Sequence, residues 1–196
     1  MAKRFLFLEI TNSEIINLIT GVRAVATGRT SVGGVHVTIR GPYNREIPRK
    51  QIEQYDRQLK GHPLLLEGIG RFEVQGRHVV YMEVQHPGLR KIWWKPDFPV
   101  HEYGFNPHVT LYEGGNIDVA DRLERFMKRE GLKLLTWDFR VTAYVSDHRD
   151  FFKSPRDTAE LFLELVNRGL VRADILARLN RALTVSTVPE EARRVV

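Results

Sequence analysis

Two short segments of the chain carry the same pattern of residues capable of acid–base chemistry. Residues 36–39 read His-Val-Thr-Ile, and residues 108–111 read His-Val-Thr-Leu. Both are typical strand sequences, and side chains alternate between the two faces of a strand. The histidine and threonine of each segment should therefore lie on one polar face, at a spacing that suits neighbouring oxygens of one phosphate group.

A pair of histidines can supply a general base and a general acid together. The ordinary pKa of an imidazole is about 6.5, so one ring can be neutral while the other is protonated near neutral pH. We expect one of His36 and His108 to take a proton from water and the other to protonate the departing oxygen of a phosphodiester. The hydroxyls of Thr38 and Thr110 would hold the non-bridging oxygens. Which imidazole is the base stays open, and no metal or other cofactor is required.

Four further side chains are candidates for binding the substrate. Arg40 and Tyr112 come two positions after the threonines and would share their polar faces if each strand stays regular that far. An arginine there can bind a phosphate oxygen, and a tyrosine can stack or form a hydrogen bond. Trp93 is followed by Trp94, so we expect one of the two to be exposed for stacking on a nucleobase. Tyr43 is a weaker candidate of the same kind.

The other histidines have a plainer interpretation. His62, His78, His86 and His101 are scattered and are interpreted as turn or surface residues, and His148 lies in a charged segment that we interpret as a solvated loop. None of them joins the two motifs at metal-ligand spacing, so a zinc or di-metal hydrolase is not supported. One His-Val-Thr segment alone would be unremarkable in a strand, but two copies followed by branched aliphatic residues favour a functional pair.

Composition and charge fit an ordinary globular protein with an anionic ligand. The 196 residues favour one compact unit or two tightly associated lobes, and the composition is 42% apolar and 28% charged. The net charge of +6 suits a phosphate ester or a nucleic acid. Because the chain has no cysteine, disulfides, thiolate metal sites and iron–sulfur clusters are excluded.

The apolar segments of the chain are short. Residues 5–8 form an apolar run that is too short for a signal peptide, and no stretch approaches the roughly 20 apolar residues of a membrane span. We therefore expect a cytoplasmic protein with no membrane association.

Strand and helix patterns alternate along the chain. Periodicity and turn residues predict strands at residues 4–10, 35–40, 64–74, 78–84 and 109–112, with one long or two short strands at 132–145. Helices are predicted between cap residues at 11–13 and Gly28, at 48–59, 87–94 and 119–128, and in two C-terminal segments at 157–167 and 172–183.

The paired motifs resemble those of the 2H phosphoesterase superfamily, which is named for two histidines in HxT or HxS motifs. That superfamily includes bacterial RNA 2′,3′-cyclic phosphodiesterases once described as 2′-5′ RNA ligases. Segments 4–8, 68–72 and 79–84 and the Asn-Pro before the second motif are similar in order and spacing, so the resemblance covers about residues 1–146.

The resemblance implies an α+β fold in which two pseudo-symmetric α/β lobes with antiparallel sheets line a central cleft. Residues 1–150 would form this bilobal domain, and residues 151–196 would form a C-terminal helical appendage. The implied activity is metal-independent hydrolysis of a 2′,3′-cyclic phosphate on an RNA end or a small nucleotide. Two alternatives stay open: hydrolysis of 2′-5′ linked or cyclic oligonucleotide messengers, and a nucleotide- or RNA-binding module with little turnover. The oligomeric state is not predicted.

Overall fold

The computed structural model describes residues 3–28, 34–93, 104–146 and 173–184. In these residues the strands are β1 (Lys3–Ile10), β2 (His36–Tyr43), β3 (Leu64–Val74), β4 (Arg77–Gln85), β5 (His108–Gly114), β6 (Lys133–Thr136) and β7 (Phe139–Ser146). The helices are α1 (Ser13–Thr27), α2 (Arg49–Leu59), α3 (Leu89–Trp93), α5 (Ile117–Glu130) and α7 (Ala173–Thr184).

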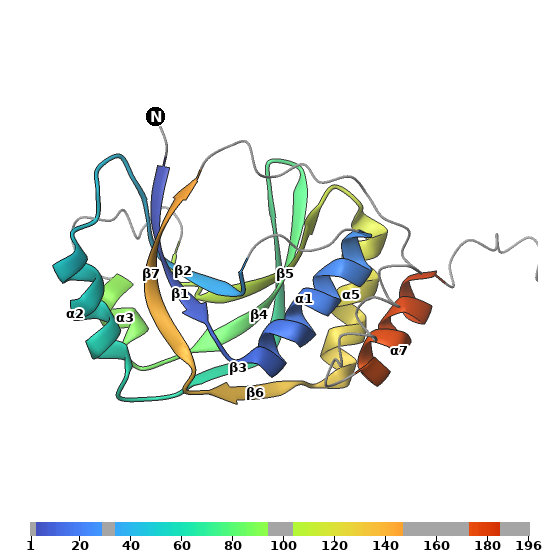
Figure 1. The fold of residues 1–196 in the computed structure, drawn as a ribbon. Helices are drawn as coiled ribbons and strands as arrows, with labels where there is room; N and C mark the ends of the chain where they lie inside the picture. The colour runs from blue at the N-terminus through green and yellow to red at the C-terminus, as the bar shows by residue number, and fades with distance from the viewer. Residues whose placement is uncertain (1–2, 29–33, 94–103, 147–172, 185–196) are drawn as a thin grey trace, which may run out of the picture.

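The strands form two antiparallel sheets (Figure 1). The first sheet has the order β2-β1-β7, and the second has the order β5-β4-β3-β6. The two motif strands, β2 and β5, are therefore edge strands of different sheets, and these two edges contact each other. The predicted α+β fold with antiparallel sheets is confirmed.

Alternation along β1 and β2 separates a core face from a polar face. Leu6, Leu8 and Ile10 are buried, whereas Phe5, Phe7 and Glu9 between them are partly exposed. Val37 and Ile39 of β2 are buried in the same way. The core faces of both sheets and the apolar faces of the helices join into one hydrophobic cluster, which holds the two motif strands in place.

Capping residues fix the two long helices that flank the sheets. The Asn12 side chain accepts a hydrogen bond from the backbone N–H of Ile15 at the start of α1, and Gly28 ends this helix with a φ of 64°. Asn116 caps α5 in the same manner, and Gly131 ends it. The predicted caps of α1 are therefore confirmed. None of the helices in the described residues is long and apolar enough to span a membrane.

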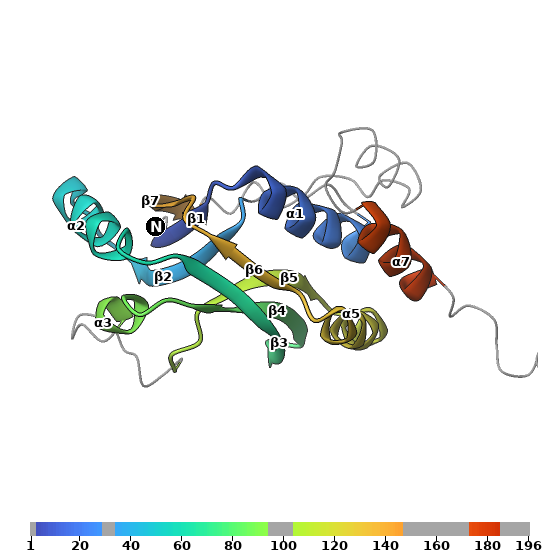
Figure 2. The ribbon, with the colours of Figure 1, turned by 90° about the horizontal axis from the view of Figure 1, so that it is seen from below.

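Helix α7 packs against α1 and α5, and its position is visible in both ribbon views (Figures 1 and 2). Its buried residues include Leu176, which lies directly against Gly21 of α1, where a Cβ atom would be 2.6 Å from a Leu176 methyl group. The Arg178 guanidinium donates to Glu130 of α5 at 2.5 Å. The predicted helix at 157–167 and the predicted boundary after residue 150 lie outside the described residues.

Candidate active site

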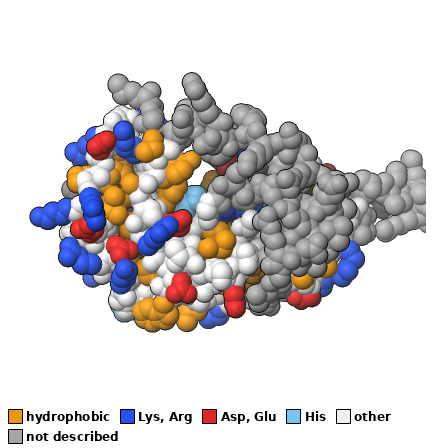
Figure 3. All heavy atoms as spheres, viewed as in Figure 1, with side chains coloured by type: hydrophobic (Ala, Val, Ile, Leu, Met, Phe, Trp, Pro, Cys, Tyr) orange, Lys and Arg blue, Asp and Glu red, His pale blue; other side chains and the backbone are white. Residues whose placement is uncertain are grey.

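The polar faces of β2 and β5 carry the two motifs, as the alternation predicts. His36 and Thr38 are partly exposed on either side of buried Val37, and His108 and Thr110 stand in the same relation on β5. Figure 3 shows a hollow near the middle of one face of the molecule, with a histidine side chain visible inside it. The motif residues are therefore accessible to a ligand on one side and fixed by the core on the other.

Each motif imidazole is held by the same backbone device. The Nδ1 atom of His36 lies 3.0 Å from the carbonyl oxygen of Gly34, and the Nδ1 atom of His108 lies 2.7 Å from the carbonyl oxygen of Asn106. A carbonyl oxygen can only accept, so Nδ1 carries the hydrogen in both rings. The Nε2 atom of each ring is then the one left to take or give a proton.

Burial lowers the pKa of both motif histidines below the ordinary 6.5. In each ring the hydrogen bond from Nδ1 to the backbone carbonyl opposes this effect. The pKa of His36 is lowered further by the charges of Arg23 and His108 and is raised by the Glu9 carboxylate. The strands that carry the two imidazoles contact each other, and a charge on His108 disfavours a charge on His36.

Aromatic rings support both imidazoles. The Phe7 ring is stacked on His36, with 3.8 Å between the ring centroids and 14° between the planes. The rings of Tyr81 and Phe72 lie 4.8 Å and 5.5 Å from the His108 ring. These contacts restrict the orientations of the imidazoles, which is what a catalytic acid and base need.

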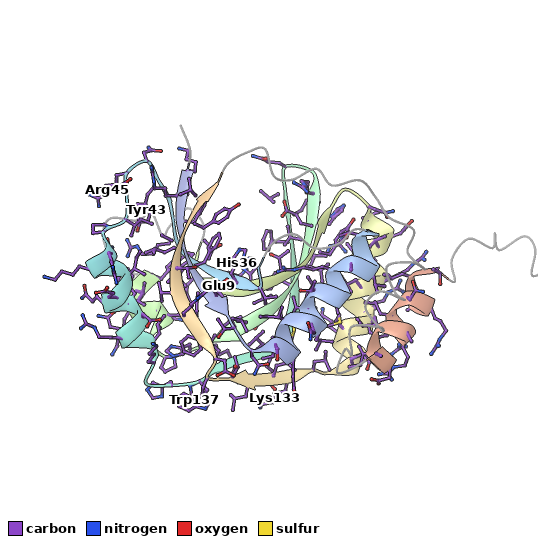
Figure 4. The ribbon with its side chains drawn as sticks, viewed as in Figure 1. Glu9, His36, Tyr43, Arg45, Lys133 and Trp137 are labelled. Atoms are coloured by element: carbon purple, nitrogen blue, oxygen red, sulfur yellow. The ribbon has the colours of Figure 1, made fainter. Side chains whose placement is uncertain are left out.

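The sequence analysis missed these aromatic residues, although their signal was present. Phe5, Phe7 and Glu9 alternate with buried residues in β1, so they share the polar face of the neighbouring motif strand. Phe7 is paired with Thr38, and Glu9 is paired with His36. Figure 4 shows Glu9 and His36 next to each other. The strand order, which a single strand sequence does not give, was needed to place them at the site.

A glycine makes room for one of the supporting rings. Gly70 is paired with Tyr81 across β3 and β4. A Cβ atom on Gly70 would be 2.4 Å from the end of the Tyr81 ring. Tyr81 can therefore lie flat against the sheet and reach His108 only because residue 70 has no side chain.

The expected position of Arg40 on the polar face is wrong. Its side chain is fully buried, where Nε donates to the Tyr43 hydroxyl at 2.5 Å and Nη1 donates to the Ile92 carbonyl at 2.7 Å. The pairing of β1 with β2 skips one residue of β2 between Thr38 and Arg40. This β-bulge reverses the alternation, so Arg40 turns to the core face.

The expected position of Tyr112 is wrong for the same reason. The pairing of β4 with β5 skips one residue between Thr110 and Tyr112, and Tyr112 turns into the core at 6% exposure. Its hydroxyl donates to the carbonyl of Asn116 at 3.3 Å. A bulge thus follows the threonine in both motifs, and the regular polar face ends there.

Trp93 and Tyr43 also lie outside the group of residues that contact the imidazoles. Trp93 is buried in α3, and its ring meets Phe105 edge-on at 5.9 Å. Trp94 lies outside the described residues. Tyr43 stands at the far end of β2 from His36 (Figure 4), and its hydroxyl accepts the hydrogen bond from Arg40. The structure gives neither Trp93 nor Tyr43 a contact with the motif histidines.

Arg23 is a further residue that the sequence did not predict, and it is bonded to both motif segments. Arg23 of α1 donates from Nε to the carbonyl of Thr110 at 2.8 Å and from Nη1 to the carbonyl of Gly34 at 3.2 Å. The sequence does show that Arg23 is a charged residue between Val22 and Val25, two aliphatic positions of a helix that packs on the core. Its position beside both motifs depends on the packing of that helix.

The remaining histidines were only partly interpreted correctly. His62 is exposed, but His86 is buried at 8% exposure, and its Nε2 lies 2.9 Å from the carbonyl of Leu59. His101 and His148 lie outside the described residues. Among the residues that the structure describes, no group of three or more His, Cys, Asp or Glu side chains is arranged to hold a metal ion.

A cavity of about 520 Å³ lies beside the second motif. It is bounded by the residues that precede His108 in the chain and by Glu83, which is paired with His108. Its lining residues are Glu83, Val84, Gln85, His86, Pro87, Arg90, Phe105, Asn106 and Pro107. This volume is within the range of small-molecule sites, about 300–1,000 Å³.

Comparison with known proteins adds no family to these observations. No model of a known protein family matches the chain, and no curated protein matches it. The 2H resemblance of the two motifs therefore stays a prediction.

Proposed function

We propose that this protein is a metal-independent phosphodiesterase that hydrolyses a 2′,3′-cyclic phosphate on an RNA end or a small nucleotide. The observation that carries the proposal is the pair of motif imidazoles, His36 and His108. Each is anchored through Nδ1 to a backbone carbonyl, and the two are coupled electrostatically. This arrangement leaves two Nε2 atoms for proton transfer to and from one phosphate.

The proposed reaction consumes one water molecule and breaks one P–O bond. The neutral imidazole accepts a proton at Nε2 from the water, whose oxygen forms a bond to phosphorus. The protonated imidazole gives its Nε2 proton to the ribose oxygen as the P–O bond breaks. The products are a phosphomonoester and a free ribose hydroxyl on the same nucleotide, and proton exchange with solvent restores the starting protonation states.

The threonines contribute hydrogen bonds to the charge that develops on the phosphate. Thr38 and Thr110 lie on the same faces as the histidines, so their hydroxyls can donate to the non-bridging oxygens. In this proposal the sugar and base of the substrate occupy the cavity formed by the residues that precede His108, which the motif histidines do not themselves line. A bound phosphate anion also raises the pKa of both imidazoles, which favours the protonated acid in the complex.

We further propose the pseudo-symmetric bilobal arrangement that the motif resemblance implies. Three shared features support it: each motif strand is the edge of its own sheet, each histidine bonds to the carbonyl two residues earlier, and each threonine is followed by a bulge. Two lobes built in this way would bring one imidazole each to a common phosphate.

The proposal is tested with 2′,3′-cyclic mononucleotides and short RNAs that end in a cyclic phosphate, in the presence of EDTA. We expect wild-type turnover to a single phosphomonoester and a loss of about 10²- to 10⁴-fold in kcat for His36→Gln and for His108→Gln. The exposed His62 provides a matched control, because His62→Gln should leave kcat unchanged.

Two outcomes would overturn the proposal. One is turnover that survives in both motif variants, because the two imidazoles would then not be the acid and base. The other is wild-type protein that forms no phosphomonoester from the cyclic-phosphate substrates. Hydrolysis of 2′-5′ linked or cyclic oligonucleotides in parallel reactions would point to that substrate class, and tight nucleotide binding without product would point to a binding module.

A further inference from the structure

A positively charged side chain joins the backbones of the two motif segments. Arg23 of α1 donates to the carbonyl oxygens of Thr110 in the second motif and of Gly34 just before the first motif. The Gly34 carbonyl also accepts the Nδ1–H hydrogen bond of His36 at 3.0 Å. One carbonyl oxygen is thus shared by the guanidinium and the imidazole.

The location of this charge is costly, so its presence requires an explanation. Arg23 is only partly exposed, and its neighbours in α1, Val22 and Ala24, are fully buried. Burial lowers the pKa of Arg23 to about 10, which still leaves the guanidinium charged near neutral pH. A charge that is partly withdrawn from water is usually tolerated where it is well paired or serves a function.

The two bonds of Arg23 connect structures that backbone pairing does not connect. β2 pairs with β1 in the first sheet, and β5 pairs with β4 in the second. The fork of the guanidinium can reach two acceptors with fixed geometry, which a lysine ammonium on its flexible stem does less well. The separation of the two motifs therefore depends in part on this side chain.

We propose that Arg23 is a positioning residue of the active site: it fixes the first motif relative to the second and keeps a positive charge beside His36. This inference rests on the proposed function for its catalytic consequence, but its effect on His36 is independent of the substrate. Arg23 would then help to position both histidines without contacting the reacting atoms.

Among the residues that the structure describes, the charges that act on His36 or on its neighbour Glu9 come from four elements. Glu9 of β1 favours the protonated imidazole and is itself bound by Arg140 of β7 at 2.8 Å. Arg23 of α1 and His108 of β5 disfavour it, and the effect of Arg23 is larger than that of Glu9. Removing the charge of Arg23 should therefore raise the pKa of His36.

The experiment compares Arg23→Gln and Arg23→Lys with wild-type protein by NMR titration of the histidine rings and by kinetics on 2′,3′-cyclic nucleotides. We expect Arg23→Gln to raise the pKa of His36 and to lower kcat by about 10- to 100-fold, because the motifs are misplaced. Arg23→Lys keeps the charge but loses the fork, so the pKa of His36 should stay near the wild-type value while kcat still falls.

Arg122 supplies the matched control. It also donates to a backbone carbonyl, that of Leu183, at 2.9 Å, but this bond joins α5 to α7 and not to the motifs. Arg122→Gln should leave kcat and the pKa of His36 unchanged. The titration of His86, which is buried elsewhere, is an internal reference.

An unchanged pKa of His36 in folded Arg23→Gln, or full activity in both Arg23 variants, would overturn the inference. If Arg23→Gln does not fold, Arg23→Lys decides the matter, since wild-type kcat in that variant would exclude a positioning role. If wild-type protein has no activity on cyclic phosphates, the proposed function fails. The titration then still decides whether Arg23 acts on His36, so the two failures are distinguishable.

Discussion

The two motifs hold their imidazoles with the same backbone bond but surround them with different chemistry. The charges of Arg23, Glu9 and His108 act on the pKa of His36. The pKa of His108 responds to burial and to its bond with Asn106, and its ring contacts those of Tyr81 and Phe72. Both imidazoles therefore have aromatic neighbours, but charged side chains act mainly on the first.

Under the proposed function, this difference would let the two copies of the motif act differently on one phosphate. The shared bond fixes Nδ1 and leaves Nε2 for proton transfer in both rings. The separate surroundings allow charge substitutions to alter the protonation of His36 directly, and that of His108 only through the interaction between the two rings. Conversely, a change in packing near Tyr81 should disturb His108 first.

The largest expected effect is on the pH dependence of kcat/KM, which follows from the burial that the two imidazoles share. Because both pKa values lie below 6.5, the form with one neutral base and one protonated acid is most populated below pH 6.5. As the pH rises, the acid loses its proton, and kcat/KM should fall about tenfold per pH unit. A pH profile of kcat/KM on a cyclic nucleotide measures this, and a maximum above pH 7 would contradict it.

The next effect should be confined to the second motif. In Gly70→Ala the new Cβ atom collides with the Tyr81 ring, which must move from its place against His108. We expect a loss of about 1–3 kcal/mol in the free energy of unfolding and about tenfold in kcat. Thermal or denaturant unfolding and steady-state kinetics measure these two quantities.

Gly115→Ala is the control for this substitution, because no heavy atom lies within 4 Å of a Cβ at that position. It should leave stability and kcat near the wild-type values. NMR shifts of the His108 ring should change in Gly70→Ala, with those of His36 nearly unchanged. Equal shifts at both rings would show that the two motifs are not separately supported.

The smallest effect should be confined to the first motif. In Glu9→Gln the carboxylate charge that favours protonated His36 is lost, so the pKa of His36 should fall while that of His108 changes less. We expect kcat to change by less than about fivefold, since partly exposed ion pairs contribute about 0–1 kcal/mol. NMR titration of both rings gives the result.

Glu67→Gln is the control for the loss of a carboxylate. Glu67 of β3 forms its ion pair with Lys133 of β6, and neither strand carries a motif. This substitution should move neither histidine pKa. A fall of the His108 pKa in Glu9→Gln, equal to that of His36, would mean that the charges act on both imidazoles alike.

The sequence predicted local structure well because local signals determine it. Asn12 and Gly28 mark the ends of α1, and the turn at Gln75 and Gly76, both with positive φ, joins β3 to β4 as expected. The strand at 35–40 was predicted to end before Gly41, but β2 continues through Gly41 to Tyr43. That strand is extended by its pairing with β1, which a local pattern does not contain.

The sequence predicted the shared polar face of the motif residues but not the side chains that surround it. The face shared by His36 and Thr38 follows from alternation over three residues. Arg40 and Tyr112 were misplaced because a bulge is a property of strand pairing, and one skipped residue moves every later side chain to the other face.

By itself, the sequence determined that two histidine–threonine strands exist, that each has one polar and one apolar face, and that the chain has no cysteine for thiolate chemistry. Tertiary structure alone decided that these strands are adjoining edges of two sheets and that Phe7, Tyr81 and Arg23 surround the imidazoles. The physical reason is range: alternation and capping act over a few residues, whereas pairing register and helix packing join residues that are distant in the chain.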